Sequence, residues 1–118
     1  MDQQRDHLKA VLGRHQDALL REDVGAIAEN YDEDAVLVVN GDVHVGRLAI
    51  QAFYAGLIKS LPTAMWHTDR ARFVNDMAYV EWSCRSPASR VPFGVDTFVV
   101  GPDGIRCQTA WFNILNVE

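Results

Sequence analysis

The side chains best suited to proton transfer in this sequence are a histidine and an aspartate placed among apolar residues. His15 lies at helical spacing in an apolar stripe with Leu12 and Leu19, and Asp96 alternates with Phe98 along an apolar run. An aspartate surrounded by apolar side chains is costly to ionise, so its pKa should rise and its protonated form could donate a hydrogen bond. Histidine can act as a general base, as an acid, or as the partner that keeps Asp96 ionised. The structural alternatives are a core histidine bonded to a carbonyl and a surface aspartate.

The histidines and cysteines do not form a metal-binding pattern. The four histidines lack the His-x-x-x-His and His-Glu-x-x-His spacings, and Cys84 and Cys107 lack Cys-x-x-Cys spacing. Two cysteines are also too few for a disulfide framework, so we expect two free thiols. The sequence predicts neither a metal ion nor any other cofactor.

Composition and charge limit the fold and the partners. With 118 residues, of which 48% are apolar and 23% charged, the chain fits one globular domain over residues 1–118. A net charge of −5 disfavours nucleic acid and anionic lipid surfaces as partners. The first residues are too polar for a secretion signal, and no apolar run approaches membrane-spanning length. We therefore expect a cytoplasmic protein without membrane contact.

Apolar spacing predicts three helices in the first half of the chain. The first helix carries the stripe that contains His15, and Asp23 is expected to cap a short second helix whose inner side extends to Tyr31. A third helical period carries Tyr54 on its apolar face and ends at Pro62.

Turn signals predict that strands make up most of the remainder. Asn40-Gly41 is a strong hairpin signal between a short strand over 35–39 and a returning strand over 43–45. Helices followed by a twisted antiparallel meander indicate an α+β domain with the helices on one face of the sheet. Four long strands are expected after residue 65, separated by turns at 75–76, 87–89 and 101–104.

Five segments spread over nearly the whole chain carry a family resemblance. They are ALLREDVGAIAENYDEDAVL, GRLAIQAFYAGL, LPTA, GVDTFVVGPDGI and TAWFN. In order and content they resemble the nuclear transport factor 2-like superfamily, which includes ketosteroid isomerases, polyketide cyclases and scytalone dehydratase. The resemblance implies a cone-shaped α+β barrel, with three N-terminal helices packed in the concave face of a strongly curved, mainly antiparallel sheet. Such a fold hosts many reactions, and also none, so function depends on individual residues.

The resemblance implies roles for four polar side chains. It directs Asp96, the acid of VDTF, into the pocket, and it puts His15 where the isomerases have an oxyanion-hole tyrosine. Tyr54, in FYA, matches a tyrosine that supports the polar network of the pocket. His67 follows LPTA on a pocket-lining strand, and with His15 and Asp96 it would suit a dehydratase-like mechanism. Val39 falls where the isomerases have their base, which argues against steroid isomerisation by the familiar route.

The sequence alone does not decide which side chains of the strand over 78–86 face the pocket. The apolar pattern favours Trp82 inward, whereas matching to the isomerases favours Glu81 inward as a reserve acid. On the last long strand, alternation turns Gln108 toward the pocket and Trp111 outward, where Trp111 is a candidate for a dimer surface. A position of Trp111 at the pocket mouth is the alternative.

The leading functional expectation is a cofactor-independent enzyme that transfers protons at a small hydrophobic carbonyl compound, by isomerase, cyclase or dehydratase chemistry. The alternative is a noncatalytic small-ligand-binding or dimerisation domain, favoured by Val39 and by Thr109 and Ala110 where limonene epoxide hydrolases have Arg-Asp. A homodimer through the convex sheet face is also expected. The predicted substrate-binding wall consists of Leu37, Val39, Phe53, Met65, Phe98, Ala110 and Phe112.

Overall fold

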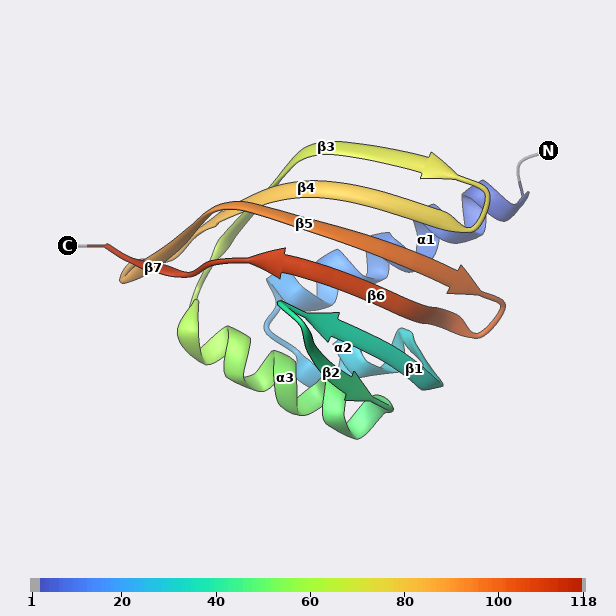
Figure 1. The fold of residues 1–118 in the computed structure, drawn as a ribbon, viewed down its shortest axis with the longest axis horizontal. Coiled ribbons are helices and arrows are strands. Elements are labelled where there is room, and N and C mark those ends of the chain that lie inside the picture. Colours follow the sequence, from blue (N-terminus) through green and yellow to red (C-terminus); the bar gives the residue numbers. More distant parts are fainter. Residues whose placement is uncertain (1–2, 118) are drawn as a thin grey trace.

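Three helices pack against one side of a curved, mixed sheet of seven strands in the computed structural model, which describes residues 3–117 (Figure 1). None of the helices in this range is long and apolar enough to cross a membrane. The helices are α1 (Gln3–Leu20), α2 (Val24–Glu29) and α3 (Arg47–Ser60). The strands are β1 (Tyr31–Val39), β2 (Asp42–Val45), β3 (Met65–Val74), β4 (Met77–Arg85), β5 (Ser89–Gly101), β6 (Gly104–Phe112) and β7 (Leu115–Asn116).

The sheet combines a C-terminal meander with an N-terminal hairpin. Its strand order is β2-β1-β6-β5-β4-β3, and the short β7 pairs with β5. All neighbouring strands are antiparallel except β1 and β6, which are parallel. The predicted α+β class and the helix-filled concave face are confirmed. The sheet stays open, because the end strands β2 and β3 do not pair with each other.

Two turns that require positive φ fix the positions of the strands. Asn40 and Gly41 have φ values of 50° and 90°, as a tight hairpin turn requires, and they confirm the predicted hairpin. Gly104 has a φ of 117°, and a Cβ there would lie 2.4 Å from the carbonyl oxygen of Asn30. Only glycine allows this approach, which brings the start of β6 against the start of β1.

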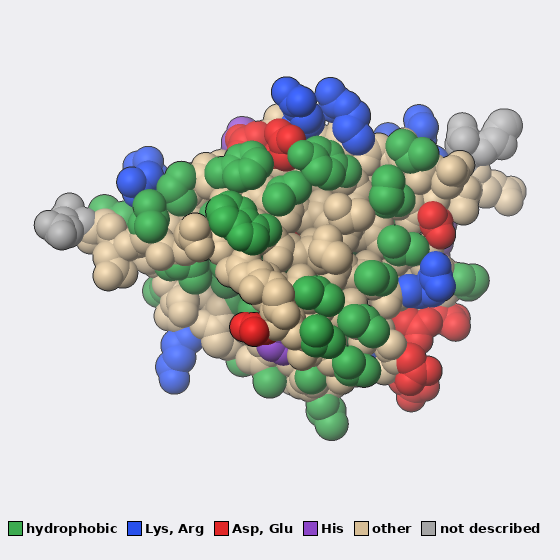
Figure 2. Space-filling view, in the orientation of Figure 1, with side chains coloured by type: hydrophobic (Ala, Val, Ile, Leu, Met, Phe, Trp, Pro, Cys, Tyr) green, Lys and Arg blue, Asp and Glu red, His purple; other side chains and the backbone are tan. Residues whose placement is uncertain are grey.

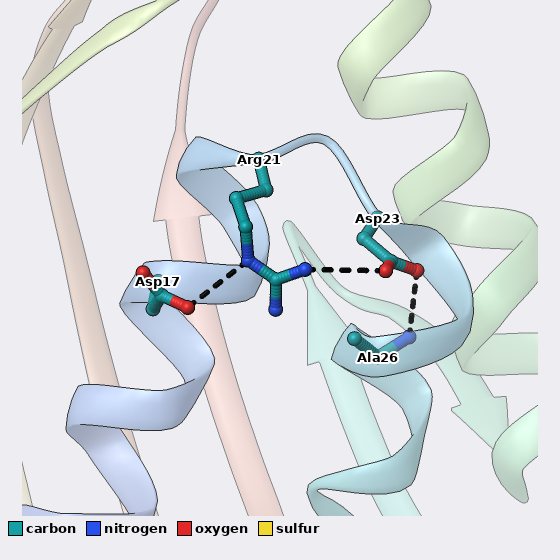
Figure 3. A network of polar contacts seen from close by, with 4 residues as sticks. All are labelled: Asp17, Arg21, Asp23 and Ala26. Atoms are coloured by element: carbon teal, nitrogen blue, oxygen red, sulfur yellow. Dashed lines mark hydrogen bonds and ion pairs between the residues drawn. The ribbon is translucent and has the colours of Figure 1, made fainter.

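The junction of α1 and α2 is organised by a small polar cluster (Figure 3). Arg21 lies between two carboxylates, with Nε 3.0 Å from Asp17 and Nη1 3.3 Å from Asp23. Asp23 also accepts a hydrogen bond of 3.0 Å from the backbone N–H of Ala26, which confirms its predicted role as the N-cap of α2. The ion pairs are about half exposed, so the cap contributes more to stability than the charges do.

The second helix is shorter than its apolar spacing predicts. It ends at Glu29, and Tyr31 is the first residue of β1, opposite Ile105 of β6. The segment pairs with β6 although its apolar spacing is helical. The pairing register shifts between Tyr31 and Val36, and the acidic residues 32–34 lie within this irregularity. Tyr31 is fully buried as a result.

Candidate functional site

A cavity of about 420 Å³ opens between the helices and the concave face of the sheet. Its walls come from α1, α3 and the four strands of the meander, and most of its lining is aromatic or aliphatic. The polar exceptions deep in the lining are Asp96, His15, Tyr54 and Gln108. A mostly apolar cavity of this size with a few converging polar groups has the character of a small-molecule site.

The strand register brings the polar side chains onto one face. Asp96 of β5 lies directly opposite Val80 of β4 and Ala110 of β6. Gln108 lies opposite Phe98, two residues along from Asp96, so it shares the concave face with the carboxyl group. Side chains from neighbouring strands on one face are close enough to form hydrogen bonds.

The carboxyl group of Asp96 accepts one hydrogen bond on each oxygen. Trp82 Nε1 donates to Oδ1 and Gln108 Nε2 donates to Oδ2, both at 3.1 Å. Burial raises the pKa of Asp96 from 3.8 to about 7, although the two N–H donors act in the opposite direction. The carboxyl group can therefore exchange a proton near neutral pH.

Gln108 joins this carboxyl group to a pair of buried tyrosines. Its Oε1 accepts hydrogen bonds from the hydroxyls of Tyr31 and Tyr54, and those two hydroxyls lie 2.8 Å apart. Burial raises the pKa of both phenols further above 10, so they remain protonated donors. The result is a connected polar network that ends at Asp96.

His15 projects from α1 into the aromatic part of the cavity. Its ring makes edge contacts with Tyr31, Tyr54 and Phe98 at centroid distances of 5.6 to 5.9 Å. Burial lowers the pKa of His15 from 6.5 to about 4, so the imidazole is neutral at neutral pH. Among residues 3–117, Nδ1 is the buried side-chain polar atom without a hydrogen-bond partner.

A glycine makes room for the tryptophan that holds Asp96. Gly94 lies opposite Trp82, and a Cβ at Gly94 would be 2.3 Å from Cε2 of the indole. The indole also contacts Trp66 and Phe112, with ring centroids 5.6 and 5.3 Å apart. Gly94 thus lets Trp82 lie across β5 with Nε1 within reach of the carboxyl group.

Comparison with known proteins gives the family. The family model of the SnoaL-like domain matches residues 12–113. This chain belongs to the SnoaL-like domain family. The family lies within the nuclear transport factor 2-like superfamily, so the resemblance seen in the sequence is confirmed. No curated protein matches the chain.

Solved structures similar to this SnoaL-like domain share its fold at low sequence identity. An NTF-2 like protein of unknown function from Burkholderia xenovorans has 18% identity and a TM-score of 0.79, over 93% of this chain and 85% of that one. The epoxide hydrolase/cyclase-like enzyme SalBIII, with a role in pyran ring formation in the polyether salinomycin, has 19% identity and a TM-score of 0.79, over 99% and 100%. A candidate polyketide cyclase from Sinorhizobium meliloti has 22% identity and a TM-score of 0.74, over 86% and 93%.

The SnoaL-like domain brings most of the sequence-predicted polar residues into one cavity. Asp96, His15 and Tyr54 all line it. His67 lies at its rim, where the side chain is 74% exposed and pairs with Asp69 at 3.3 Å. Within residues 3–117, no three His, Cys, Asp or Glu side chains gather closely enough to hold a metal ion.

Only some of the residues predicted to form the apolar wall line the cavity. Phe53, Phe98, Ala110 and Phe112 line the cavity. Met65 does not, because it is 74% exposed and its neighbour Trp66 turns inward instead. Leu37 and Val39 are buried in the core on β1, beside Gln108 and Ala110 of the neighbouring β6, and they do not line the cavity.

The open orientation of β4 is resolved in favour of the apolar pattern. Val80 and Trp82 line the cavity, whereas Glu81 lies on the other face, hydrogen-bonded to Tyr79 and 3.6 Å from Arg70. Gln108 is a polar residue of the site to which the sequence had given no role. Alternation had placed it on the pocket face, so an amide among apolar neighbours was the available signal.

Proposed function

We propose that this SnoaL-like domain is a cofactor-independent enzyme that transfers a proton at a small hydrophobic carbonyl compound, in a reaction of isomerase, cyclase or dehydratase type. The observation that carries the proposal is the carboxyl group of Asp96, whose pKa burial raises to about 7 in an apolar cavity. A catalytic acid or base works best when its pKa lies near the working pH. The cyclase-like role named for SalBIII supports the cyclase option among these reactions.

Asp96 is proposed as the group that takes up and returns the proton. Trp82 Nε1 and Gln108 Nε2 only donate, so neither can accept a proton from the neutral carboxylic acid. The proton of neutral Asp96 then occupies a remaining lone pair, from which it can reach a ligand in the cavity. The same oxygen acts as the base once Asp96 is ionised.

His15 is proposed as the hydrogen-bond donor to the substrate carbonyl. A buried N–H without an acceptor is rarer than a buried acceptor without a donor, so we assign the proton of neutral His15 to Nε2 rather than to unpartnered Nδ1. Because Val39 supplies no base, the roles differ from those of the isomerases. Asp96 removes a proton next to the carbonyl, and His15 stabilises the oxygen that gains charge. Tyr54 supports Asp96 through Gln108.

The test uses 5-nitrobenzisoxazole, a flat ring compound that reports a base directly. Removal of its C–H proton breaks the N–O bond and releases a coloured nitrile phenolate. We expect a saturable rate that rises with pH and levels off above about pH 7, because only ionised Asp96 is a base. Asp96→Asn should lower the rate by about 100-fold or more. An equal rate in a folded Asp96→Asn protein would contradict the role of Asp96.

A binding domain without catalysis is the second candidate. It is supported by buried Val39 at the position of the isomerase base and by a network whose members already satisfy one another. Quenching of tryptophan fluorescence by 5-nitrobenzisoxazole, without turnover above the Asp96→Asn level, would favour this function. Turnover that depends on Asp96 would exclude it.

The homodimer through the convex sheet face remains a prediction. Trp111 is 50% exposed there, beside a shallow depression formed with Val95, Thr97 and Thr109. An apolar residue at this position is typical of an interface. Sedimentation at micromolar concentration should show a dimer that Trp111→Arg dissociates, and a monomeric wild type would contradict the prediction.

A further inference from the structure

We propose that Gln108 is a positioning residue, oriented by the hydroxyls of Tyr31 and Tyr54, that controls the ionisation of Asp96 and the direction in which its carboxyl group presents a proton. The catalytic consequence of this inference rests on the proposed function. The effect on Asp96 itself does not, because it follows from the contacts of the amide.

Every polar atom of the network has a defined partner. Gln108 is 2% exposed, and its amide is held at both ends: Oε1 by the two phenols and Nε2 by Asp96. A continuous chain of donors runs from Tyr31 to Gln108 to Asp96, and the hydroxyl of Tyr54 lies 2.8 Å from that of Tyr31 and 3.3 Å from Oε1. The chain therefore directs an N–H toward the carboxyl group.

The orientation of the amide decides what Asp96 can do. If the Gln108 amide were flipped, its carbonyl oxygen would face Asp96 and repel the ionised carboxylate. A flipped amide would also accept the proton of neutral Asp96, which would draw that proton away from the cavity. Because the hydroxyl of Tyr31 donates to Oε1, with the hydroxyl of Tyr54 3.3 Å from the same oxygen, the phenols favour the amide orientation that leaves the acidic proton available to a ligand.

The other groups around Asp96 do not provide this control. His15 on α1 is neutral at neutral pH, and Tyr31 on β1 and Tyr54 on α3 stay protonated. Asp17 and His67 line the outer part of the cavity. No charged side chain among the described residues pairs with Asp96, so the N–H groups of Gln108 and Trp82 are what favours its ionised form. Trp82 has no comparable chain of donors behind it.

The experiment compares Gln108→Leu and Tyr31→Phe with Thr109→Val, a control on the same strand with an exposed side chain. The readout is the titration midpoint of Asp96, followed by NMR of aspartate carboxyl carbons and assigned with Asp96→Asn. We expect Gln108→Leu to raise the midpoint by about one pH unit, since it removes one hydrogen bond to a charged group. Tyr31→Phe, which keeps the ring, should raise it by less, and Thr109→Val should leave it unchanged.

The possible outcomes separate this inference from the proposed function. If Gln108→Leu does not fold, Tyr31→Phe alone carries the test. Unchanged midpoints in the folded variants would overturn the inference and leave Gln108 with a packing role. Shifted midpoints in a protein that does not turn over 5-nitrobenzisoxazole would support the inference and refute the proposed function. Where turnover occurs, the pH profile of the rate should shift with the NMR midpoint.

Discussion

Two carboxyl groups on adjacent strands, Asp96 on β5 and Glu81 on β4, lie on opposite faces of the same sheet. Asp96 faces an apolar cavity, and within residues 3–117 its ionised form is supported only by uncharged N–H donors. Glu81 accepts a hydrogen bond from Tyr79 and lies 3.6 Å from the half-exposed guanidinium of Arg70. A one-residue shift in the register of either strand would turn its carboxyl group to the opposite face of the sheet. The phase of the strand, more than the residue type, determines which carboxyl group is suited to acid-base chemistry.

The aromatic residues of the two faces show the same contrast. Trp82 packs between Trp66 and Phe112 and uses its indole N–H inside the cavity. Trp111 is half exposed on the outer face. Figure 2 shows hydrophobic side chains remaining at the surface of the molecule in several places, so exposure of apolar groups is not confined to the cavity. What distinguishes the concave face is that Asp96, Gln108 and the tyrosines form one connected hydrogen-bond network against an apolar cavity.

The largest expected effect separates the two carboxyl groups by activity. On 5-nitrobenzisoxazole, Glu81→Gln should retain a rate within about twofold of the wild type, against a loss of about 100-fold in Asp96→Asn. The two substitutions make the same chemical change on opposite faces. Similar losses in both variants, at equal fold stability measured by circular dichroism, would remove the distinction between the faces.

The next effect concerns the glycine beneath Trp82. Gly94→Ala should lower the free energy of unfolding by about 2 kcal/mol, because the new methyl group displaces the indole. Gly56→Ala is the matched control, since a Cβ there meets nothing within 4 Å and alanine favours the α3 helix. Urea unfolding measures both changes. A Gly94→Ala protein as stable as Gly56→Ala would mean that Trp82 can move without cost.

A third effect is the pH dependence of stability. Folding raises the pKa of Asp96 from 3.8 to about 7. Ionisation of Asp96 therefore does not lower the free energy of unfolding below pH 4, and it lowers that free energy progressively more between pH 4 and pH 7. Asp96→Asn removes this cost, and it should raise Tm relative to the wild type by several degrees more at pH 8 than at pH 4. Glu81→Gln should not show this rise. Thermal unfolding across pH 4 to 8 measures the difference, and a constant Tm gain would argue against buried ionisation.

The smallest effect belongs to the outer ion pair. Arg70→Ala should change the free energy of unfolding by less than about 0.5 kcal/mol, because the Arg70 side chain is 58% exposed and the pair is weak in water. Urea unfolding in low and high salt provides the measurement. A loss above about 1 kcal/mol would show that the outer face contributes more than its exposure suggests.

The sequence was informative where local physics determines structure. Apolar periods located all three helices, and Asn40-Gly41 located the hairpin, because each depends on neighbours in the chain. Tyr31 was misplaced in a helix because its strand forms only by pairing with β6, more than seventy residues later. Met65 was predicted to line the cavity for a similar reason. Which side chains of β3 face the cavity depends on how the strand packs in the folded sheet, and Trp66 faces it instead of Met65. The partners of Gln108 come from three separate elements, so no local pattern could reveal its role.

The enclosure of His15 and Asp96 in one apolar cavity has a consequence for the proton count of folding. Between about pH 4 and 6.5, the unfolded chain carries a proton on His15 and none on Asp96, whereas the folded chain has the reverse, because burial lowers the pKa of His15 to about 4 and raises that of Asp96 to about 7. Folding then moves one proton between the residues without net uptake or release. The opposing contributions of the two residues to the slope of stability against pH cancel in this window. These two residues together therefore leave the stability of the domain unchanged by mild acid, and both are uncharged in the folded state.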